Sequence, residues 1–155
     1  MVDDRPGVIA PPPLIFGIGM GLGFLMTWVF PLPWFSVTPP IRNAIGWLFI
    51  GSAIGVAGWS LYTMHHAGTH VDPNRPTTTI VDSGPYRYTR NPIYLSMASV
   101  EIGLGWLFAT LWLWILLVPV LLIIRFGVIA REEHYLAEKF GNTYRDYQRH
   151  VRRWI

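Results

Sequence analysis

The stretch IYLSMASVEIGLGWLFATLWLWILLVPVLLII, from Ile93 to Ile124, decides the fold. Most of it is apolar, and its only charged side chain is Glu101. At about 1.5 Å of rise per residue, a single helix of this length would be much longer than a bilayer core of roughly 30 Å requires. Because glycines and a threonine inside the stretch offer places to turn, it predicts two helices, over residues 93–108 and 110–130.

Two more apolar runs, over residues 14–30 and 41–64, have the composition of membrane spans. The whole chain is 52% hydrophobic and 14% charged, whereas soluble domains carry about 25% charge. We therefore expect an all-α integral membrane protein, a single domain over residues 1–155 with four transmembrane helices. The N-terminus lacks the positive start of a cleavable signal, so residues 14–30 are interpreted as a permanent span.

The basic residues are unevenly distributed. The connection 63–92 holds Arg75, Arg87 and Arg90, residues 125–153 hold seven Lys or Arg, and residues 31–40 hold none. The positive-inside rule predicts a multi-pass protein of the bacterial inner membrane with both termini in the cytoplasm. A basic block beside apolar spans favours anionic membrane lipids, not nucleic acid, as its partner.

Glycines recur in the first two apolar runs. No strand precedes them, so a phosphate-binding loop is disfavoured. Small residues on membrane helices are typical of close helix packing, and this interpretation covers Gly17, Gly19, Gly21, Gly23, Gly51 and Gly55.

The C-terminal residues predict two further helices. Ile129, Leu136 and Phe140 recur at helical spacing, Gly141 is a natural helix stop, and Asn142 can cap the next helix. The last helix is expected to lie at the membrane interface. Its apolar stripe comprises Tyr144, Tyr147, Val151 and Trp154, and its residues for lipid headgroups are Arg145, Arg149, Arg152 and Arg153.

The segment 77–94 carries the strongest indication of chemistry. Ser83-Gly84-Pro85 is a tight turn, Pro92 suits the first position of a helix, and Asn91 can cap that helix. These features would fix several side chains at the membrane surface, where a helix N-terminus and Arg90 favour a carboxylate. Nearby tyrosines could stack on an adenine or face a sulfonium.

Glu132 and Glu133 follow the fourth predicted span on the same side of the membrane. Paired acids would repel anionic lipid, so one of them is interpreted as binding a cation or hydroxyls, such as the amino group or ribose of a cofactor. The alternative is that both are surface acids that form ion pairs with Arg131 and Lys139.

These motifs, in this order, resemble the isoprenylcysteine carboxyl methyltransferase-like membrane enzymes, a group that includes relatives of phospholipid methyltransferases. The resemblance covers Thr77 to Trp154 and rests on Ser83-Gly84-Pro85-Tyr86, Arg90-Asn91-Pro92-Ile93-Tyr94, Glu132-Glu133, Phe140-Gly141 and Tyr144. It implies an S-adenosylmethionine-dependent methyltransferase with a lipid-like small-molecule acceptor.

By position, the resemblance implies a cofactor set of Val81, Tyr86, Arg90, Asn91, Pro92, Tyr94 and Glu132. The second acid of the pair, Glu133, completes the predicted set. Eukaryotic members of this group carry histidine before the proline, where this chain has Asn91. Asparagine does not titrate, which disfavours proton transfer at this position and a prenylcysteine substrate.

Glu101 is predicted to be catalytic, because an ionisable residue within a span marks function or a buried pairing. It lies two helical turns after Tyr94 and would point into a cavity above the cofactor. The hypothesis is that Glu101 orients or deprotonates the acceptor. The alternative is a structural hydrogen bond to another span, for example to Ser52 or Thr27.

Two other functions compete with methyl transfer: a membrane reductase related to sterol reductases, and a non-enzymatic membrane scaffold or transporter subunit. His65, His66 and His70 could suggest a metal, but Gly68 interrupts the helical spacing. No metal site is predicted, and these histidines are expected near headgroups. The sequence carries no signal for an oligomeric state or for the identity of the acceptor.

Overall fold

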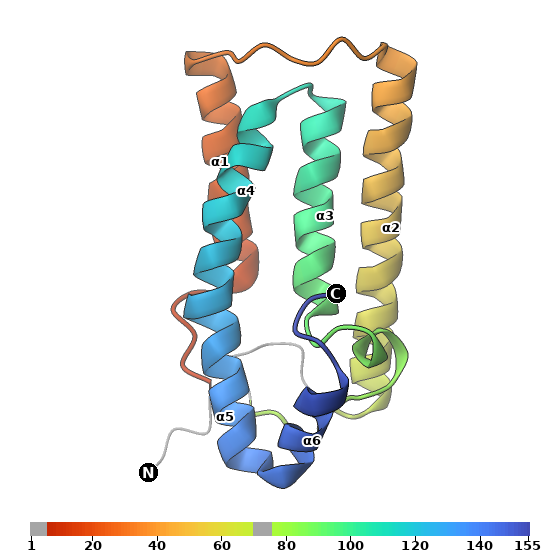
Figure 1. Cartoon of the computed structure of the whole chain (residues 1–155), viewed down its shortest axis with the longest axis vertical. Helices are drawn as coiled ribbons and strands as arrows, with labels where there is room; N and C mark the ends of the chain where they lie inside the picture. The colour runs from red at the N-terminus through yellow and green to blue at the C-terminus, as the bar shows by residue number, and fades with distance from the viewer. Residues whose placement is uncertain (1–5, 70–75) are drawn as a thin grey trace.

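The computed structural model describes residues 6–69 and 76–155, and the regular structure within these ranges is all helical (Figure 1). Four helices run up and down: α1 (Pro12–Val29), α2 (Pro39–His66), α3 (Pro92–Leu107) and α4 (Leu111–Ile123). A short 3-10 helix, η1 (Gly84–Arg87), precedes α3, and a π-helical stretch follows α4. The order ends with η2 (Ile124–Ile129), α5 (Ala130–Phe140) and α6 (Asn142–His150). The predicted all-α fold is confirmed.

Three helices in the described part of the chain are long and apolar enough to cross a bilayer: Pro12–Val29, Pro39–His66 and the continuous helix Leu111–Phe140. The fourth helix, α3, has 16 residues, about 24 Å of rise at 1.5 Å per residue. That is shorter than a typical bilayer core of roughly 30 Å. The four helices form where the sequence predicts them, whereas the count of four crossings stays a prediction.

The last long helix continues past residue 130, where the sequence analysis ended the fourth span. Residues Leu111–Phe140 form one helix through the π-helical η2, because no helix stop occurs before Gly141. Gly141 ends the helix with φ 56°, a left-handed value that glycine adopts without strain. The extra turns carry Glu132 and Glu133 beyond the apolar part of the helix.

Close packing through glycine joins the helices at a few points. The third helix, α3, packs against α1, α2 and α4, and α1 packs against α4. A Cβ added to Gly103 of α3 would lie 2.8 Å from the carbonyl oxygen of Gly46 in α2. A Cβ on Gly23 of α1 would lie 2.6 Å from Leu113 Cδ2 in α4, and one on Gly19 would meet Val120. The small-residue interpretation is therefore confirmed for Gly19 and Gly23.

The same interpretation is wrong, within this chain, for Gly17, Gly21, Gly51 and Gly55. A Cβ at any of these positions would have nothing within 4 Å. Successive helical residues are rotated by about 100°, so Gly17 and Gly21 point away from the face that carries Gly19 and Gly23. The stripe of Gly51 and Gly55 lies on the outer face of α2.

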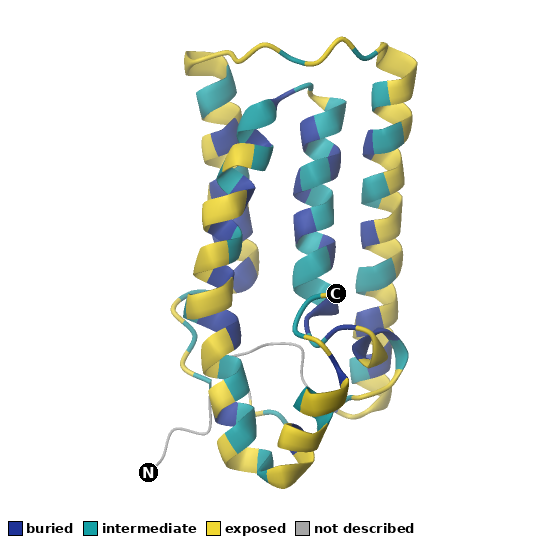
Figure 2. Ribbon diagram, in the orientation of Figure 1, coloured by how far each residue is buried: buried dark blue, intermediate teal, exposed yellow. Residues whose placement is uncertain are grey.

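The outer faces of α1 and α2 are apolar and exposed (Figure 2). Trp28 is 83% exposed and Leu48 is 71% exposed, values that suit contact with lipid and not with water. The inner faces hold the core, which includes Phe16, Leu113 and Ile124. Apolar side chains on both the inner and the outer faces of the helices are what a bundle within a membrane requires.

The connecting segments divide between the two ends of the bundle (Figure 1). The α1–α2 connection and the α3–α4 turn lie at one end. The segment that contains η1, together with α5 and α6, lies at the other end. The described arginines of the segment before α3 and of α5, α6 and the C-terminal residues thus share one end, as the positive-inside argument requires, whereas Arg42 lies in the first turn of α2 near the other end. That this end faces the cytoplasm stays a prediction.

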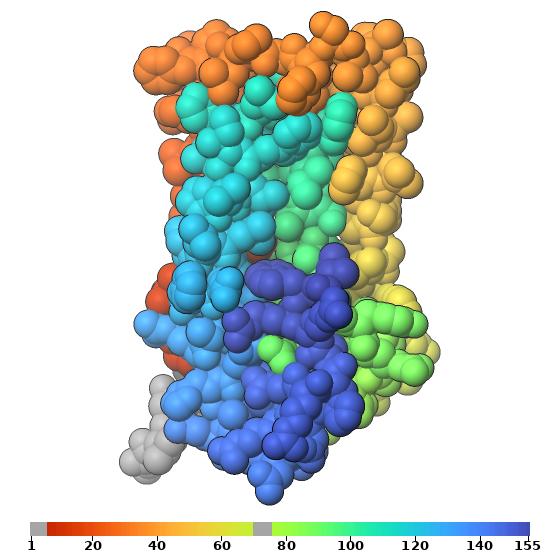
Figure 3. Space-filling view, viewed as in Figure 1, coloured from red at the N-terminus to blue at the C-terminus, as the bar shows by residue number. Residues whose placement is uncertain are grey.

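The last helix, α6, packs against the protein with its aromatic face. Tyr144 and Val151 are buried, whereas Arg145, Arg149 and Arg152 are exposed. The C-terminal residues cover the lower end of the bundle in Figure 3. Two expectations are corrected here: the apolar stripe contacts the chain itself, and no side-chain cap is made at the start of α6, where Gly141 holds the N-cap position.

Candidate functional site

A cavity of about 510 Å³ lies at the end of the bundle where α3, α5, α6 and the segment before α3 meet. All eight predicted cofactor residues line it: Val81, Tyr86, Arg90, Asn91, Pro92, Tyr94, Glu132 and Glu133. The described lining also includes residues that the sequence analysis did not assign to the site, among them Pro11, Pro12, Pro13, Met64, Met97, Tyr135, Tyr144 and Tyr147. Segments far apart in the sequence therefore converge on one cavity.

The turn before α3 is held against α2. Gly84 has φ 57°, and a Cβ there would lie 2.5 Å from Thr63 Oγ1 of α2. Only glycine fits this turn without strain or overlap. The turn buries Tyr86 in the cavity wall, and Tyr147 of α6 donates a hydrogen bond of 2.8 Å to the Tyr86 carbonyl. Burial, and secondarily the charge of Glu132, raises the pKa of Tyr86 above its ordinary value, so its hydroxyl stays protonated.

Glu132 brings a carboxylate to the cavity. The hydroxyl of Tyr94, in the first turn of α3, donates a 2.7 Å hydrogen bond to Glu132 Oε1. Within residues 6–69 and 76–155, no ion pair or further hydrogen bond engages this carboxylate. Its second oxygen, Oε2, is therefore available to a ligand with N–H or O–H groups.

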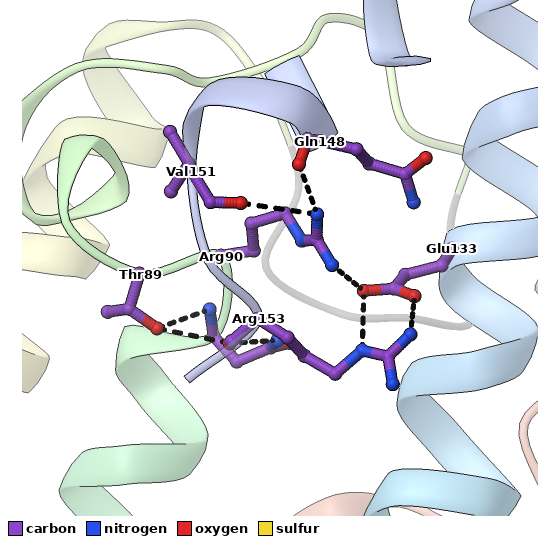
Figure 4. A network of polar contacts seen from close by, with 7 residues as sticks. Thr89, Arg90, Glu133, Gln148, Val151 and Arg153 are labelled. Atoms are coloured by element: carbon purple, nitrogen blue, oxygen red, sulfur yellow. Dashed lines mark hydrogen bonds and ion pairs between the residues drawn. The ribbon is translucent and has the colours of Figure 1, made fainter. Parts of the chain in front are cut away.

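Glu133, by contrast, is fully engaged in the network of Figure 4. Arg153 binds both of its oxygens, with Nε at 3.0 Å from Oε1 and Nη2 at 2.5 Å from Oε2. Arg90 Nη2 donates a further bond of 2.8 Å to Oε1. The Glu133 side chain is 11% exposed, and charge-assisted bonds at such a site are strong. The alternative interpretation was that both glutamates are surface acids that pair with Arg131 and Lys139. It is wrong for Glu133, which pairs with Arg90 and Arg153.

Arg90 also donates to the C-terminal segment. Its Nη1 donates to the carbonyls of Gln148 and Val151, at 3.1 and 3.2 Å. Its Nε is buried and has no partner in the described structure. Three of its five N–H groups are thus engaged, and two, one on Nε and one on Nη2, have no partner in the described structure. The bidentate capture of a ligand carboxylate by Arg90 stays a prediction.

The Asn91 side chain binds the C-terminal segment at Arg153 and does not cap α3. Its Nδ2 donates to the Arg153 carbonyl at 2.8 Å, and no side-chain cap is present at this helix start. The neighbouring Thr89 Oγ1 donates to the same carbonyl at 3.2 Å, and Arg90 N donates to the Arg152 carbonyl at 2.9 Å. Pro92 begins α3 as predicted.

Arg153 is the site residue whose role the sequence analysis mistook. It was assigned to lipid headgroups together with the neighbouring arginines, but it pairs with Glu133. The pattern of α6 gives no signal for this, because Arg153 follows the end of the helix at His150.

Glu101 does not belong to the described lining of the cavity. It is fully buried, and neither carboxylate oxygen has a hydrogen-bond partner in the described structure. The structural alternative named Ser52 and Thr27 as partners. Ser52 instead donates to the Phe49 carbonyl, and Thr27 bonds with Gly23 and Thr110.

The histidines at the end of α2 lie outside the cavity. His65 and His66 are exposed, and the ring of His66 packs on Tyr62 with centroids 4.1 Å apart. His70 lies outside the described residues. Among the residues that the structure describes, no group of three His, Asp or Glu side chains could hold a metal ion.

The fold and the cavity define a class: a polytopic helical membrane protein with a ligand-sized pocket at one membrane surface. Residues 41–143 match the phospholipid methyltransferase family, and the chain belongs to that family. Family membership implies a methyltransferase that acts on a lipid-type substrate.

One curated relative is similar to part of the chain. An uncharacterized protein of Haemophilus influenzae is 44% identical over 68 residues, which cover 41% of this chain and 100% of the relative. No solved structure matches the chain.

Proposed function

We propose that this protein transfers the methyl group of S-adenosylmethionine to a lipid-like acceptor carried in the membrane. The observation that supports the proposal most is the cavity itself. Its volume of about 510 Å³ lies within the range of roughly 300–1,000 Å³ that is typical of small-molecule sites. Its position at one end of the bundle lets a polar cofactor and a membrane-borne acceptor approach the same place.

The donor and acceptor groups of the cavity fit this cofactor. Glu132 Oε2 can accept hydrogen bonds from an ammonium or from ribose hydroxyls. The rings of Tyr86, Tyr94 and Tyr144 offer faces for an adenine or for a sulfonium charge. Arg90 lines the cavity and would offer its unpartnered N–H groups to a ligand carboxylate.

When bound, S-adenosylmethionine supplies a methyl group already activated by its positive sulfur. The protein then needs to orient donor and acceptor and to exclude water. Tyr144 and Tyr147 of α6 line the cavity. The hydrogen bonds from Arg90 and Asn91 to the carbonyls of Gln148, Val151 and Arg153 hold the following segment against the start of α3, and this packing would serve that exclusion.

The charge of the cavity disfavours the reductase alternative. Arg90 is the single basic side chain in its described lining, against two carboxylates, Glu132 and Glu133. A nicotinamide dinucleotide phosphate carries several negative phosphates and would require more cations. Glu132, the carboxylate that no arginine binds, suits a cofactor with an ammonium and a sulfonium.

Calorimetry on the purified protein in detergent tests the proposal. We expect S-adenosylmethionine to bind and the reduced dinucleotide phosphate not to bind. Glu132→Gln should weaken binding by about 1.5–3 kcal/mol, because a hydrogen bond to a charged group is lost. The matched control is Glu138→Gln on the same helix, since Glu138 is 70% exposed and pairs only with His134 in the described structure. Equal affinity in both variants, or tighter binding of the dinucleotide, would overturn the proposal.

A further inference from the structure

Glu101 is the least explained charged group in the described structure. It lies in the middle of α3 and is 0% exposed, with both oxygens buried and unpartnered. Burying a polar group without a hydrogen bond is unfavourable, and ionisable residues inside membrane spans mark function by default. A leucine at this position would avoid that cost.

The helices around Glu101 leave space for it and offer no partner. Its Oε1 lies 3.9 Å from the position of a Cβ added to Gly19, which in turn would meet Val120. Gly19 therefore brings the backbone of α1 close to the carboxyl group without contributing a donor. The two hydroxyl groups that the sequence analysis named as partners, those of Ser52 and Thr27, donate their hydrogen bonds to carbonyls of their own helices.

Glu101 lies one helical turn along α3 from a residue that lines the cavity. Met97 lines the cavity, and Glu101 follows it by four residues on nearly the same face of α3. Side chains on a helix lean toward its N-terminus, so the Glu101 side chain leans over the turn that carries Met97. Methionine is flexible and is well suited to yield to an incoming group.

We propose that Glu101 receives the methyl acceptor, binding the N–H or O–H of the nucleophilic atom and taking its proton during methyl transfer. This inference rests on the proposed function of the cavity. The sulfur–methyl bond breaks as the acceptor nitrogen or oxygen bonds the methyl carbon. The sulfur keeps the electron pair, and the proton of the acceptor passes to a Glu101 oxygen.

The proposal restricts the acceptor by chemistry. A nucleophile that carries a proton, such as an amine or a hydroxyl on a lipid, satisfies the orphaned oxygens of Glu101 as it enters. A carboxylate acceptor offers no donor and repels Glu101 at close range in an apolar surrounding. The fit therefore favours protic acceptors over fatty acids and over a prenylcysteine carboxylate.

The test uses the full chain in vesicles made from a lipid extract of the source membrane, with methyl-deuterated S-adenosylmethionine as donor. Labelled lipid is measured by mass spectrometry, and cofactor affinity is measured by calorimetry. Glu101→Gln keeps the shape of the side chain but cannot take a proton. We expect its turnover to fall by about 100-fold or more, as for loss of a general base, with cofactor affinity within about twofold of the wild type.

The matched control is Ser60→Ala, which removes another fully buried polar side chain from the bundle. Ser60 is 0% exposed and bonds only the Val56 carbonyl of its own helix in the described structure, so turnover should not change. Wild-type turnover in Glu101→Gln, or label appearing chiefly on carboxyl groups as methyl esters, would overturn the proposal. Loss of cofactor binding in Glu101→Gln would also overturn it. Absence of cofactor binding or of labelled lipid in the wild type would instead refute the proposed function and remove the basis of this inference.

Discussion

At the scale of single residues, the site depends on which polar groups are satisfied within the chain and which are left for a ligand. Glu132 and Glu133 are adjacent in sequence, yet Glu133 is bound by two arginines and Glu132 by one tyrosine. Their side chains leave a helix about 100° apart, so each meets different partners. The carboxylate that remains available for chemistry is the one without an arginine.

This division predicts that Glu133 stabilises the fold. Glu133→Gln should lower the free energy of unfolding by about 1.5–3 kcal/mol, because it removes the charge that two arginines share at a nearly buried site. Asp146→Asn is the control, since its pair with Arg149 is 60% and 75% exposed, and it should change stability by less than about 0.5 kcal/mol. Thermal unfolding in detergent measures both. Equal effects would mean that the network contributes no more than a surface ion pair.

At the scale of elements, the glycines show how far periodicity in the sequence can be interpreted. The spacing of the glycines indicates small residues on helices, but it does not determine which face of a helix packs against a neighbouring helix. The pair of α2 and α3 meets at Gly46 and Gly103, two positions that the sequence analysis did not single out for packing. The prominent Gly51 and Gly55 of α2 face outward.

The contrast between the packed and the outward-facing glycines can be tested by single glycine-to-alanine substitutions, which add one methyl group. Gly103→Ala should destabilise the protein by about 1–3 kcal/mol through overpacking, because its Cβ would meet the backbone oxygen of Gly46. Gly51→Ala has open space around it and should be neutral or raise stability by up to about 1 kcal/mol through helix propensity. Unfolding midpoints of the two variants decide the matter. A destabilised Gly51→Ala would place that face of α2 in a contact outside the single chain.

At the scale of the whole molecule, hydropathy was sufficient to predict the helices, since lipid requires the backbone to satisfy its own hydrogen bonds. The motifs around Arg90 and Glu132 were sufficient to predict that these two segments converge on one cavity, but not that the start of α1, the end of α2 and α6 also line it. The partners of those residues were not predictable. The Arg90–Glu133–Arg153 network joins positions up to 63 residues apart along the chain, through contacts that only the packed structure brings together.

The arrangement of the helices makes a further prediction about the membrane. The α1–α2 connection and the α3–α4 turn lie at one end of the bundle, opposite α6 (Figure 1). If α3 crosses the bilayer despite its 16 residues, these two connections share a compartment.

The chain contains no cysteine, so single substitutions can be labelled without background by a membrane-impermeant maleimide. In intact cells, Ser36→Cys and Ala109→Cys should react, whereas Thr143→Cys should react only after permeabilisation, because the arginine-rich end stays in the cytoplasm. Labelling of Ser36→Cys without Ala109→Cys would show that the α3–α4 turn does not reach the far surface, and the chain would then have two complete crossings, α1 and α2, followed by a helical hairpin that enters the bilayer and returns.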